Sequence, residues 1–313
     1  MKLFADRLQD SILKNSSVIV AGFDPVIDGF PAFLLEQAVT AKTKPAEALK
    51  NLLVEFHRAA LDEIRTSVAA VKINTAFFEQ YGLCGLEAMQ IIAAEVKACG
   101  LLLIADAKRG DIGSTAQAYS RAFLGHTSAF NEHFSLLDAD ALTINPFLGF
   151  DTLDSFLEDS IEHKKGIFVL VRTSNPGSGS LQSLRNNSGK TASEIIAAWI
   201  AEHSHSLKGE CGLSGLGAVV GATYPKEAEM LRDIMKDSFF LLPGFGTQGA
   251  SAQDLDKVFL RDKKSGNAGG AVINISRALF SKFPESIKNT KALKTEIRRR
   301  LSLFNSEINS NLR

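Results

Sequence analysis

Short runs of apolar residues alternate along the chain with longer segments of helix-forming composition. Each run is a largely continuous apolar stretch rather than a strict alternation of apolar and polar residues, which is typical of parallel strands that are covered on both faces. Eight such runs are present, at residues 18–24, 68–74, 101–107, 139–145, 166–172, 216–222, 239–245 and 270–276. We therefore expect eight buried parallel strands.

The segments between these runs predict helices, several of which open with Asp, Ser or Pro, as helix N-termini often do. They lie at residues 46–64, 86–97, 114–123, 151–157, 192–201 and 225–236, and an amphipathic helix at 1–15 precedes them. Eight strand and helix units in 313 residues favour a (β/α)8 TIM barrel over an open doubly wound sheet. Because no linker separates two halves, we expect one α/β barrel domain over residues 1–313 with an N-terminal helix.

Two connections between these elements are unusually long. Residues 23–45 lie between the first strand and its helix, and residues 173–190 follow the fifth strand. The second connection is rich in Gly, Ser and Asn, which is the composition of an irregular loop. It fits either a surface insertion or a lid that closes over a ligand.

The charge balance of the chain argues against several classes of partner. Lys and Arg total 35, as do Asp and Glu, so no global positive field attracts nucleic acid or an anionic membrane. No uncharged apolar run reaches the roughly 18 residues of a transmembrane span, and residues 1–15 lack a signal-peptide pattern. Cys84, Cys99 and Cys211 are scattered without metal-ligand spacing, which fits a reducing compartment. We expect a cytoplasmic protein with no nucleic-acid or membrane partner.

Charged and polar residues gather where the first three predicted strands end, and in a (β/α)8 barrel this rim carries the catalytic groups. Asp106 and Lys108 are two apart, so they share a face of an extended strand, and Lys72 is their neighbour if sequential strands are adjacent. Opposite unit charges about 4 Å apart attract by roughly 4 kcal/mol at an effective dielectric of 20. We expect an alternating charged array, for which a purely structural ion-pair network is the alternative. Its members are Lys72, Asp106, Lys108 and Asp111.

A second candidate site follows the seventh and eighth strands, where this fold commonly holds phosphate. Residues 243–249 read Pro-Gly-Phe-Gly-Thr-Gln-Gly, and glycines let backbone amides approach an anion. Arg277 follows the eighth strand and could add a bidentate contact. A common glycine turn and a solvated arginine are the alternatives for these two features.

Several of these segments together resemble the orotidine 5′-phosphate decarboxylase family in its longer-chain, type 2 branch. The run Asp106-Ala107-Lys108-Arg109-Gly110-Asp111-Ile112 with Thr115 resembles the signature of that family. The likeness extends over nearly the whole chain, through residues 21–25, 71–74, 145–149, 242–248 and 274–277. So many motifs in order, each at a predicted strand end, make the resemblance highly specific.

The resemblance implies a role for each matching residue. Lys72, Asp106, Lys108 and Asp111 would form the catalytic array, and Lys108 would protonate the pyrimidine carbon that carbon dioxide leaves. The residues implied to bind substrate are Asp24, Lys72 and Thr115 at the ribose, Asn74 close by, Ser174 at the pyrimidine edge, and Gln248 and Arg277 at the phosphate. The reaction would need no cofactor and no metal. Asp111 and Thr115 would complete the site of the other subunit, so a homodimer is implied.

Two other functions fit parts of this pattern. Magnesium-dependent sugar-phosphate decarboxylases or synthases of the same barrel group also show an Asp-x-Lys-x-x-Asp motif, with carboxylates from strands two and three as metal ligands. Here the second strand ends in Lys72, and a lysine at that position would repel the ion. A barrel that binds a nucleotide without turning it over is the other alternative, although binding alone needs neither both lysines nor both aspartates.

Overall fold

The computed structural model describes residues 1–245, 253–261 and 268–312. Within them, eight parallel strands close into a barrel in the order β1-β12-β9-β8-β7-β6-β3-β2. Each strand overlaps one of the eight apolar runs, which confirms the predicted (β/α)8 barrel. The barrel strands are β1 (Ile19–Phe23), β2 (Ala70–Asn74), β3 (Leu102–Arg109), β6 (Ala141–Ile144), β7 (Gly166–Arg172), β8 (Ser214–Val220), β9 (Ser238–Leu242) and β12 (Ala271–Ile275).

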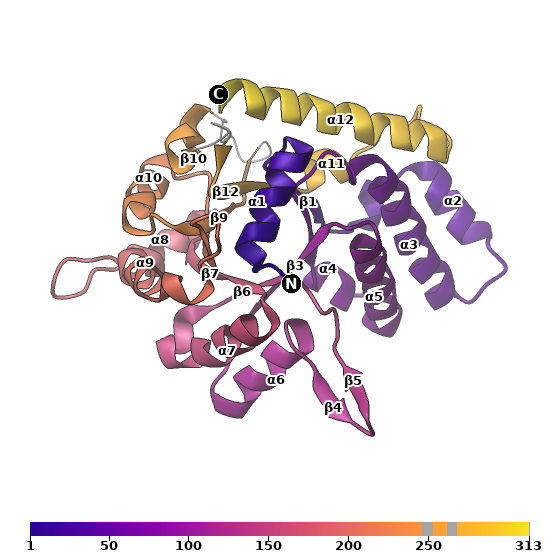
Figure 1. Cartoon of the computed structure of the whole chain (residues 1–313). Coiled ribbons are helices and arrows are strands. Elements are labelled where there is room, and N and C mark those ends of the chain that lie inside the picture. The colour runs from indigo at the N-terminus through magenta and orange to yellow at the C-terminus, as the bar shows by residue number, and fades with distance from the viewer. Residues whose placement is uncertain (246–252, 262–267, 313) are drawn as a thin grey trace.

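Helices surround the barrel, and those predicted from the sequence are present (Figure 1). The segment predicted at 151–157 instead begins with a 3-10 turn, η3 (Phe150–Leu153), and its α-helix extends further, to His163. The predicted helices are α1 (Phe4–Asn15), α3 (Pro45–Ile64), α5 (Gly82–Ala98), α6 (Gly113–Phe123), α7 (Asp154–His163), α9 (Ala192–His203) and α10 (Pro225–Ile234).

The structure also contains elements that the hydrophobic pattern did not predict. The largest is α12 (Thr290–Asn311), which packs against α3 and extends along one edge of the molecule (Figure 1). A hairpin of β4 (Thr127–Ala129) and β5 (Glu132–Phe134) projects away from the barrel. The remaining elements are α2 (Ala32–Thr40), α4 (Ala76–Glu79), α8 (Gly179–Gln182), α11 (Arg277–Phe280), β10 (Leu260–Arg261), β11 (Ala268–Gly269), and the 3-10 turns η1 (Ile27–Gly29), η2 (Pro146–Leu148), η4 (Pro176–Ser178), η5 (Ser204–Leu207) and η6 (Gln253–Val258).

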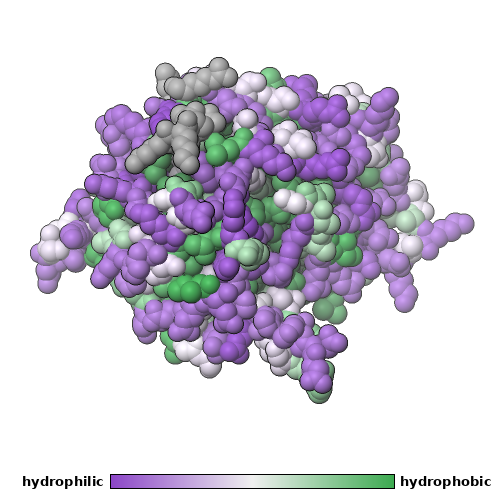
Figure 2. Space-filling model, viewed as in Figure 1, coloured by the Kyte–Doolittle hydropathy of each residue, from purple (hydrophilic) through white to green (hydrophobic). Residues whose placement is uncertain are grey.

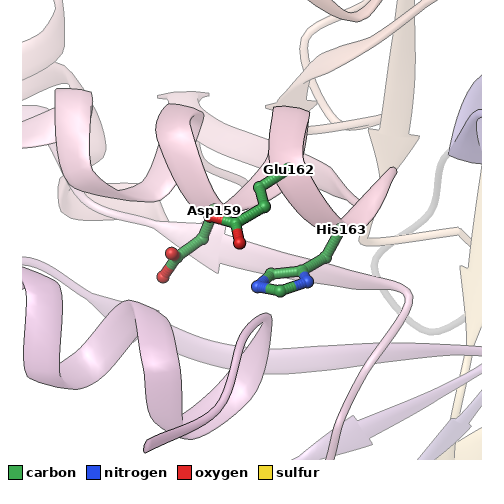
Figure 3. A group of neighbouring side chains, drawn as sticks. All are labelled: Asp159, Glu162 and His163. Carbon is green, nitrogen blue, oxygen red and sulfur yellow. The ribbon is translucent and has the colours of Figure 1, made fainter.

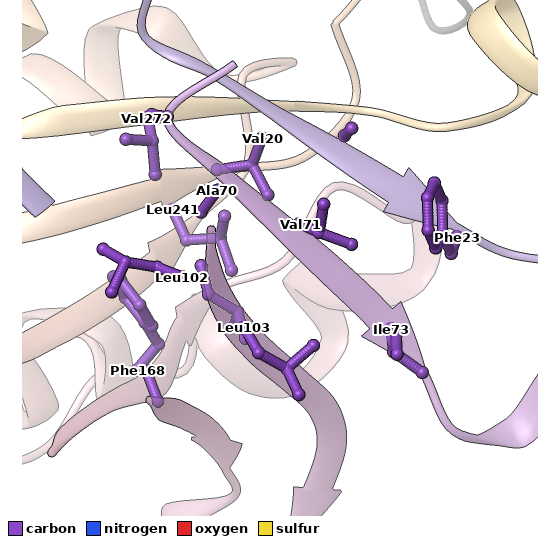
Figure 4. Packing of buried hydrophobic residues seen from close by; sticks show 14 of the residues in the cluster. Val20, Phe23, Ala70, Val71, Ile73, Leu102, Leu103, Phe168, Leu241 and Val272 are labelled. Carbon is purple, nitrogen blue, oxygen red and sulfur yellow. The ribbon is translucent and has the colours of Figure 1, made fainter. Parts of the chain in front are cut away.

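The core is formed by the strands and by the helix faces that cover them. All five residues of β1 and all seven of β8 are buried, as expected for strands covered on both sides. Val20, Val71 and Leu103 are among the apolar side chains that pack together around neighbouring strands (Figure 4). The outer surface in the view of Figure 2 is mostly hydrophilic. Among the described helices, none is long and apolar enough to cross a membrane.

Helix α1 packs against the amino-terminal end of the barrel. Its Phe4 ring lies edge-on to Phe168, with ring centroids 6.0 Å apart. A Cβ at Gly166 would lie 2.2 Å from the Phe4 ring, so this glycine makes room for the aromatic side chain. Because α1 covers this end, the carboxyl ends of the strands are the open face of the barrel.

The connection at 173–190 folds against the end of β7 as η4 and α8. Arg172 is buried, and its guanidinium donates to Glu227 at 2.7 Å and also to Ser178 in the connection. The Gln182 side chain donates to Thr173 Oγ1 at 2.9 Å and accepts from the Thr173 backbone N–H at 2.9 Å. These bonds tie both parts of the connection to the barrel rim.

Candidate active site

Three charged residues from two adjacent strands meet Asp24 at the carboxyl end of the barrel. Lys72 Nζ on β2 lies 2.9 Å from Asp106 Oδ2 and 3.4 Å from Asp24 Oδ1. Lys108 Nζ lies 2.6 Å from the other Asp106 oxygen, Oδ1. The result is a continuous chain of alternating charge, Asp24, Lys72, Asp106 and Lys108. It lines a cavity of about 400 Å³ at the barrel mouth.

The inner part of this array is buried and stays charged. Lys72 is only 3% exposed. Burial alone would lower the pKa of Lys72, but the carboxylates of Asp106 and Asp24 outweigh it and raise the pKa. Burial would likewise raise the pKa of Asp106, and the two lysines together hold that pKa well below its usual range. Both groups therefore keep their charges at neutral pH.

The backbone at the end of β3 presents Lys108 to the cavity. Lys108 adopts a left-handed conformation with φ of 49°, within a register irregularity between β3 and β6. Its backbone N–H donates to Thr143 Oγ1 at 3.0 Å, and that hydroxyl donates to Asp106 Oδ1 at 2.9 Å. Thr143 on β6 thus holds both the strand end and the central carboxylate. The side chain of the neighbouring Arg109 instead forms an ion pair with Glu79, with 2.5 Å between Arg109 Nη2 and Glu79 Oε1.

Thr143 was not predicted as a site residue. The available signal was a threonine between the apolar residues Leu142 and Ile144, and such a residue must find a hydrogen-bond partner when the strand is buried.

The opposite side of the cavity is formed by the ends of β9 and β12. Pro243, Gly244 and Phe245 line it, and Gly244 has a φ of 97°, a conformation that favours glycine. Arg277 lies exposed at the first position of α11 and also lines the cavity. Gln248, the other predicted phosphate contact, lies outside the described residues.

Asn274 also lines the cavity, although the sequence predicted no role for it. Its Nδ2 donates to Ser276 Oγ at 3.2 Å, while its Oδ1 is buried and has no hydrogen-bond partner among the described residues. A Cβ at Gly22 would lie 1.9 Å from Ser276 Oγ, so the missing side chain there leaves room for these polar groups. An unpartnered buried acceptor at a cavity wall is suited to a ligand donor.

The remaining predicted substrate residues divide into two sets. Asn74 and Ser174 line the cavity, as does Thr173 beside the latter. Asp111 and Thr115 do not line it: Asp111 Oδ1 accepts from the Ile112 backbone N–H at 2.8 Å, and Thr115 is exposed on α6. Of the predicted catalytic array, this chain therefore brings together Lys72, Asp106 and Lys108.

Comparison with known proteins decides the family. The model of the orotidine 5′-phosphate decarboxylase / HUMPS family matches residues 54–285. Proteins named orotidine 5′-phosphate decarboxylase from Caldicellulosiruptor bescii and Rhodopirellula baltica are each 40% identical over 88% of this chain, and the matches cover 89% and 88% of those proteins. This chain belongs to the orotidine 5′-phosphate decarboxylase / HUMPS family.

The solved structures agree with this assignment. The structure of Leishmania donovani OMP decarboxylase covers 99% of this chain, and 99% of its own length is matched, with a TM-score of 0.69 and 29% sequence identity. The family predicted from the strand-end motifs is therefore confirmed, as is the fold. The matched family joins two groups, the orotidine 5′-phosphate decarboxylases and the HUMPS proteins. The residues at the barrel mouth must therefore indicate which of the two chemistries this chain performs.

Proposed function

We propose that this chain decarboxylates orotidine 5′-phosphate to uridine 5′-phosphate, the last step of de novo pyrimidine nucleotide synthesis, without a cofactor. The observation that carries this proposal is the position of Lys72 and Lys108 on either side of Asp106, at 2.9 Å and 2.6 Å, beside a nucleotide-sized cavity. We place the reaction in the cytoplasm, since Cys84, Cys99 and Cys211 are free thiols suited to a reducing compartment.

Lys108 is the proton donor in this mechanism. Loss of carbon dioxide from the pyrimidine leaves a carbanion with no adjacent carbonyl to delocalise its charge. A nearby ammonium group stabilises this charge and then transfers a proton to the carbon, so the carbon–carboxylate bond breaks and a carbon–hydrogen bond forms. Asp106 holds the ammonium in place before the reaction begins, which is electrostatic preorganisation.

Binding groups around this centre set the substrate's orientation. Asp24, which follows β1, and Lys72 on β2 line the cavity and bind the ribose hydroxyls, with Asn74 close by, while Ser174 reads the pyrimidine edge. Arg277 and Gln248 bind the phosphate. Contacts at the phosphate are remote from the reacting carbon, so their binding energy can position the substrate against Lys108.

A homodimer completes the site, with Asp111 and Thr115 entering the cavity of the partner chain. Neither residue lines this chain's cavity, although both follow β3, which supplies Asp106 and Lys108 to it. Exposed apolar side chains accompany them: Ile112 is 63% exposed and Phe147 is 76% exposed. The segments that carry Ile112 and Phe147 are close neighbours, because a Cβ at Gly110 would lie 2.7 Å from the Asn145 carbonyl oxygen. This apolar rim supports a subunit interface.

Sugar-phosphate chemistry with magnesium is the competing function. It needs a cluster of carboxylate oxygens around the ion, including one from the second strand. At that position the structure has the Lys72 ammonium, which already bridges Asp24 and Asp106. A cation between these carboxylates repels Mg²⁺ and neutralises the oxygens that would bind it.

The test is turnover of orotidine 5′-phosphate, followed by loss of pyrimidine absorbance, before and after prolonged chelator treatment and dialysis. We expect the same rate in both samples. A loss of rate that magnesium restores would support the competing function, magnesium-dependent sugar-phosphate chemistry. No turnover in a folded sample that binds uridine 5′-phosphate would show a nucleotide-binding barrel instead.

A further inference from the structure

A second cluster of ionisable groups lies on α7, separate from the cavity at the barrel mouth. Asp159, Glu162 and His163 occupy positions i, i+3 and i+4 of this helix, so they share one face. Their side chains project toward a common space, as Figure 3 shows. One oxygen or nitrogen atom from each lies within 4.8 Å of the others.

In the part of the chain that the structure describes, no lysine or arginine neutralises the carboxylates of this cluster. Among the described residues, neither Asp159 nor Glu162 forms an ion pair with a lysine or arginine. Asp159 Oδ2 is also buried and has no hydrogen-bond partner among the residues that the structure describes. A buried, unpartnered carboxylate oxygen is costly, and a bound cation would remove that cost.

The loop before the β4–β5 hairpin lies directly against the same atoms. An ideal Cβ at Gly125 would lie 3.2 Å from His163 Nε2 and 3.3 Å from Asp159 Oδ2. The absent side chain therefore leaves space beside these two ligand atoms. The next residue, His126, has its ring centroid 5.3 Å from that of His163 and 4.2 Å from that of His133. His126 therefore lies beside the cluster, although its nitrogens do not belong to the group of mutually close ligand atoms.

We propose that Asp159, Glu162 and His163 form a site for one divalent transition-metal ion, with Zn²⁺ as the best fit. Imidazole nitrogens select zinc and its neighbours over magnesium and calcium, and carboxylates complete mixed zinc sites. The ion would lie on α7, beside the segment that leads into β4. This site is independent of the proposed decarboxylation.

The test is calorimetric titration of zinc chloride into chelator-treated, dialysed full-length protein. We expect one ion bound per chain. His163→Ala and Glu162→Gln should each weaken the affinity at least about tenfold, since losing even a supporting contact of a metal site costs 10- to 100-fold. Glu162 is exposed, so its substitution should not disturb folding. Thermal melting should show zinc raising the melting temperature of the wild type more than that of either variant.

His205→Ala is the matched control, because His205 is an exposed histidine on η5, outside the cluster. It should bind zinc as the wild type does. Absence of one-to-one binding, unchanged affinity in both cluster variants, or an equal loss in His205→Ala would each overturn the proposal. Magnesium chloride binding as tightly as zinc chloride would also overturn it, because the His163 imidazole would then have no part.

Discussion

At the scale of single residues, the proposed chemistry depends on Lys108 and Asp106. The left-handed backbone at Lys108 bends the end of β3 so that the ammonium returns to a carboxylate two residues earlier. The sequence predicted that these two side chains would meet, because residues two apart on a strand share a face. It could not predict the bend itself, which depends on the hydrogen bond from the Lys108 backbone to Thr143 on another strand.

Replacing Lys108 with alanine should abolish decarboxylation while the protein still folds and binds uridine 5′-phosphate. A general acid alone contributes roughly 10²- to 10⁴-fold, and the electrostatic role of Lys108 adds to that. Lys50→Ala is the control, since Lys50 forms an ordinary surface ion pair with Glu87 at 3.2 Å. Steady-state rates should fall only for Lys108→Ala, and a rate within tenfold of wild type would refute its role as proton donor.

His57 should make folding stability depend on pH. It is buried among Phe23, Phe30 and Phe56, and burial lowers its pKa to about 4 from the usual 6.5. As the pH falls from 6.5 toward 4, the unfolded chain takes up a proton that the folded chain does not, so stability decreases over this range. The full effect is about 3 kcal/mol, from 1.36 kcal/mol per pKa unit.

Urea denaturation at pH 7 and pH 5 measures this effect. His57→Gln should show a smaller loss of unfolding free energy between the two pH values than the wild type, even if it is less stable at both. His205→Ala, which alters an exposed histidine, should retain the wild-type difference. An unchanged difference in His57→Gln would show that another group controls the acid sensitivity.

At the scale of elements, the sequence predicted best what was most buried. The eight barrel strands have continuous apolar runs because helices cover them on both sides. The β4–β5 hairpin had no comparable signal: its strands are three residues long, and five of their six residues are exposed. Helix α12 is mostly polar and buries Leu293, Ile297 and Leu301, a four-residue spacing that could have revealed it.

The loops after β9 and β12 are expected to act together on the phosphate. Arg277→Ala should weaken uridine 5′-phosphate binding by roughly 10- to 100-fold, the range for one lost hydrogen bond to a charged group. Binding of uridine, which lacks the anion, should hardly change. Arg299→Ala is the control, because Arg299 pairs with Glu296 on the surface of α12. Equal losses for both ligands in Arg277→Ala would indicate a structural arginine.

At the scale of the whole molecule, one chain contains an incomplete version of the predicted array. Lys72, Asp106 and Lys108 line the cavity, whereas Asp111 lies beyond it. The sequence predicted the residue set through family resemblance, but strand spacing alone would have placed all four charges in one chain. The proposed contact between subunits would leave no signature in the periodicity of a single chain.

Mixing two inactive variants tests the shared site most directly. Lys108→Ala and Asp111→Ala dimers should each be inactive. After subunit exchange about half the dimers are mixed, and one site of each mixed dimer combines Lys108 from one chain with Asp111 from the other. Roughly a quarter of all sites should therefore recover wild-type activity.

The control mixture is Lys108→Ala with Asp106→Ala, because these residues lie 2.6 Å apart in the same chain and no exchange can restore both to one site. We predict recovery of decarboxylation to about a quarter of the wild-type rate in the first mixture and none in the control. If the first mixture remains inactive after exchange has been verified, Lys108 and Asp111 do not complete one site across two chains, which would contradict the shared active site.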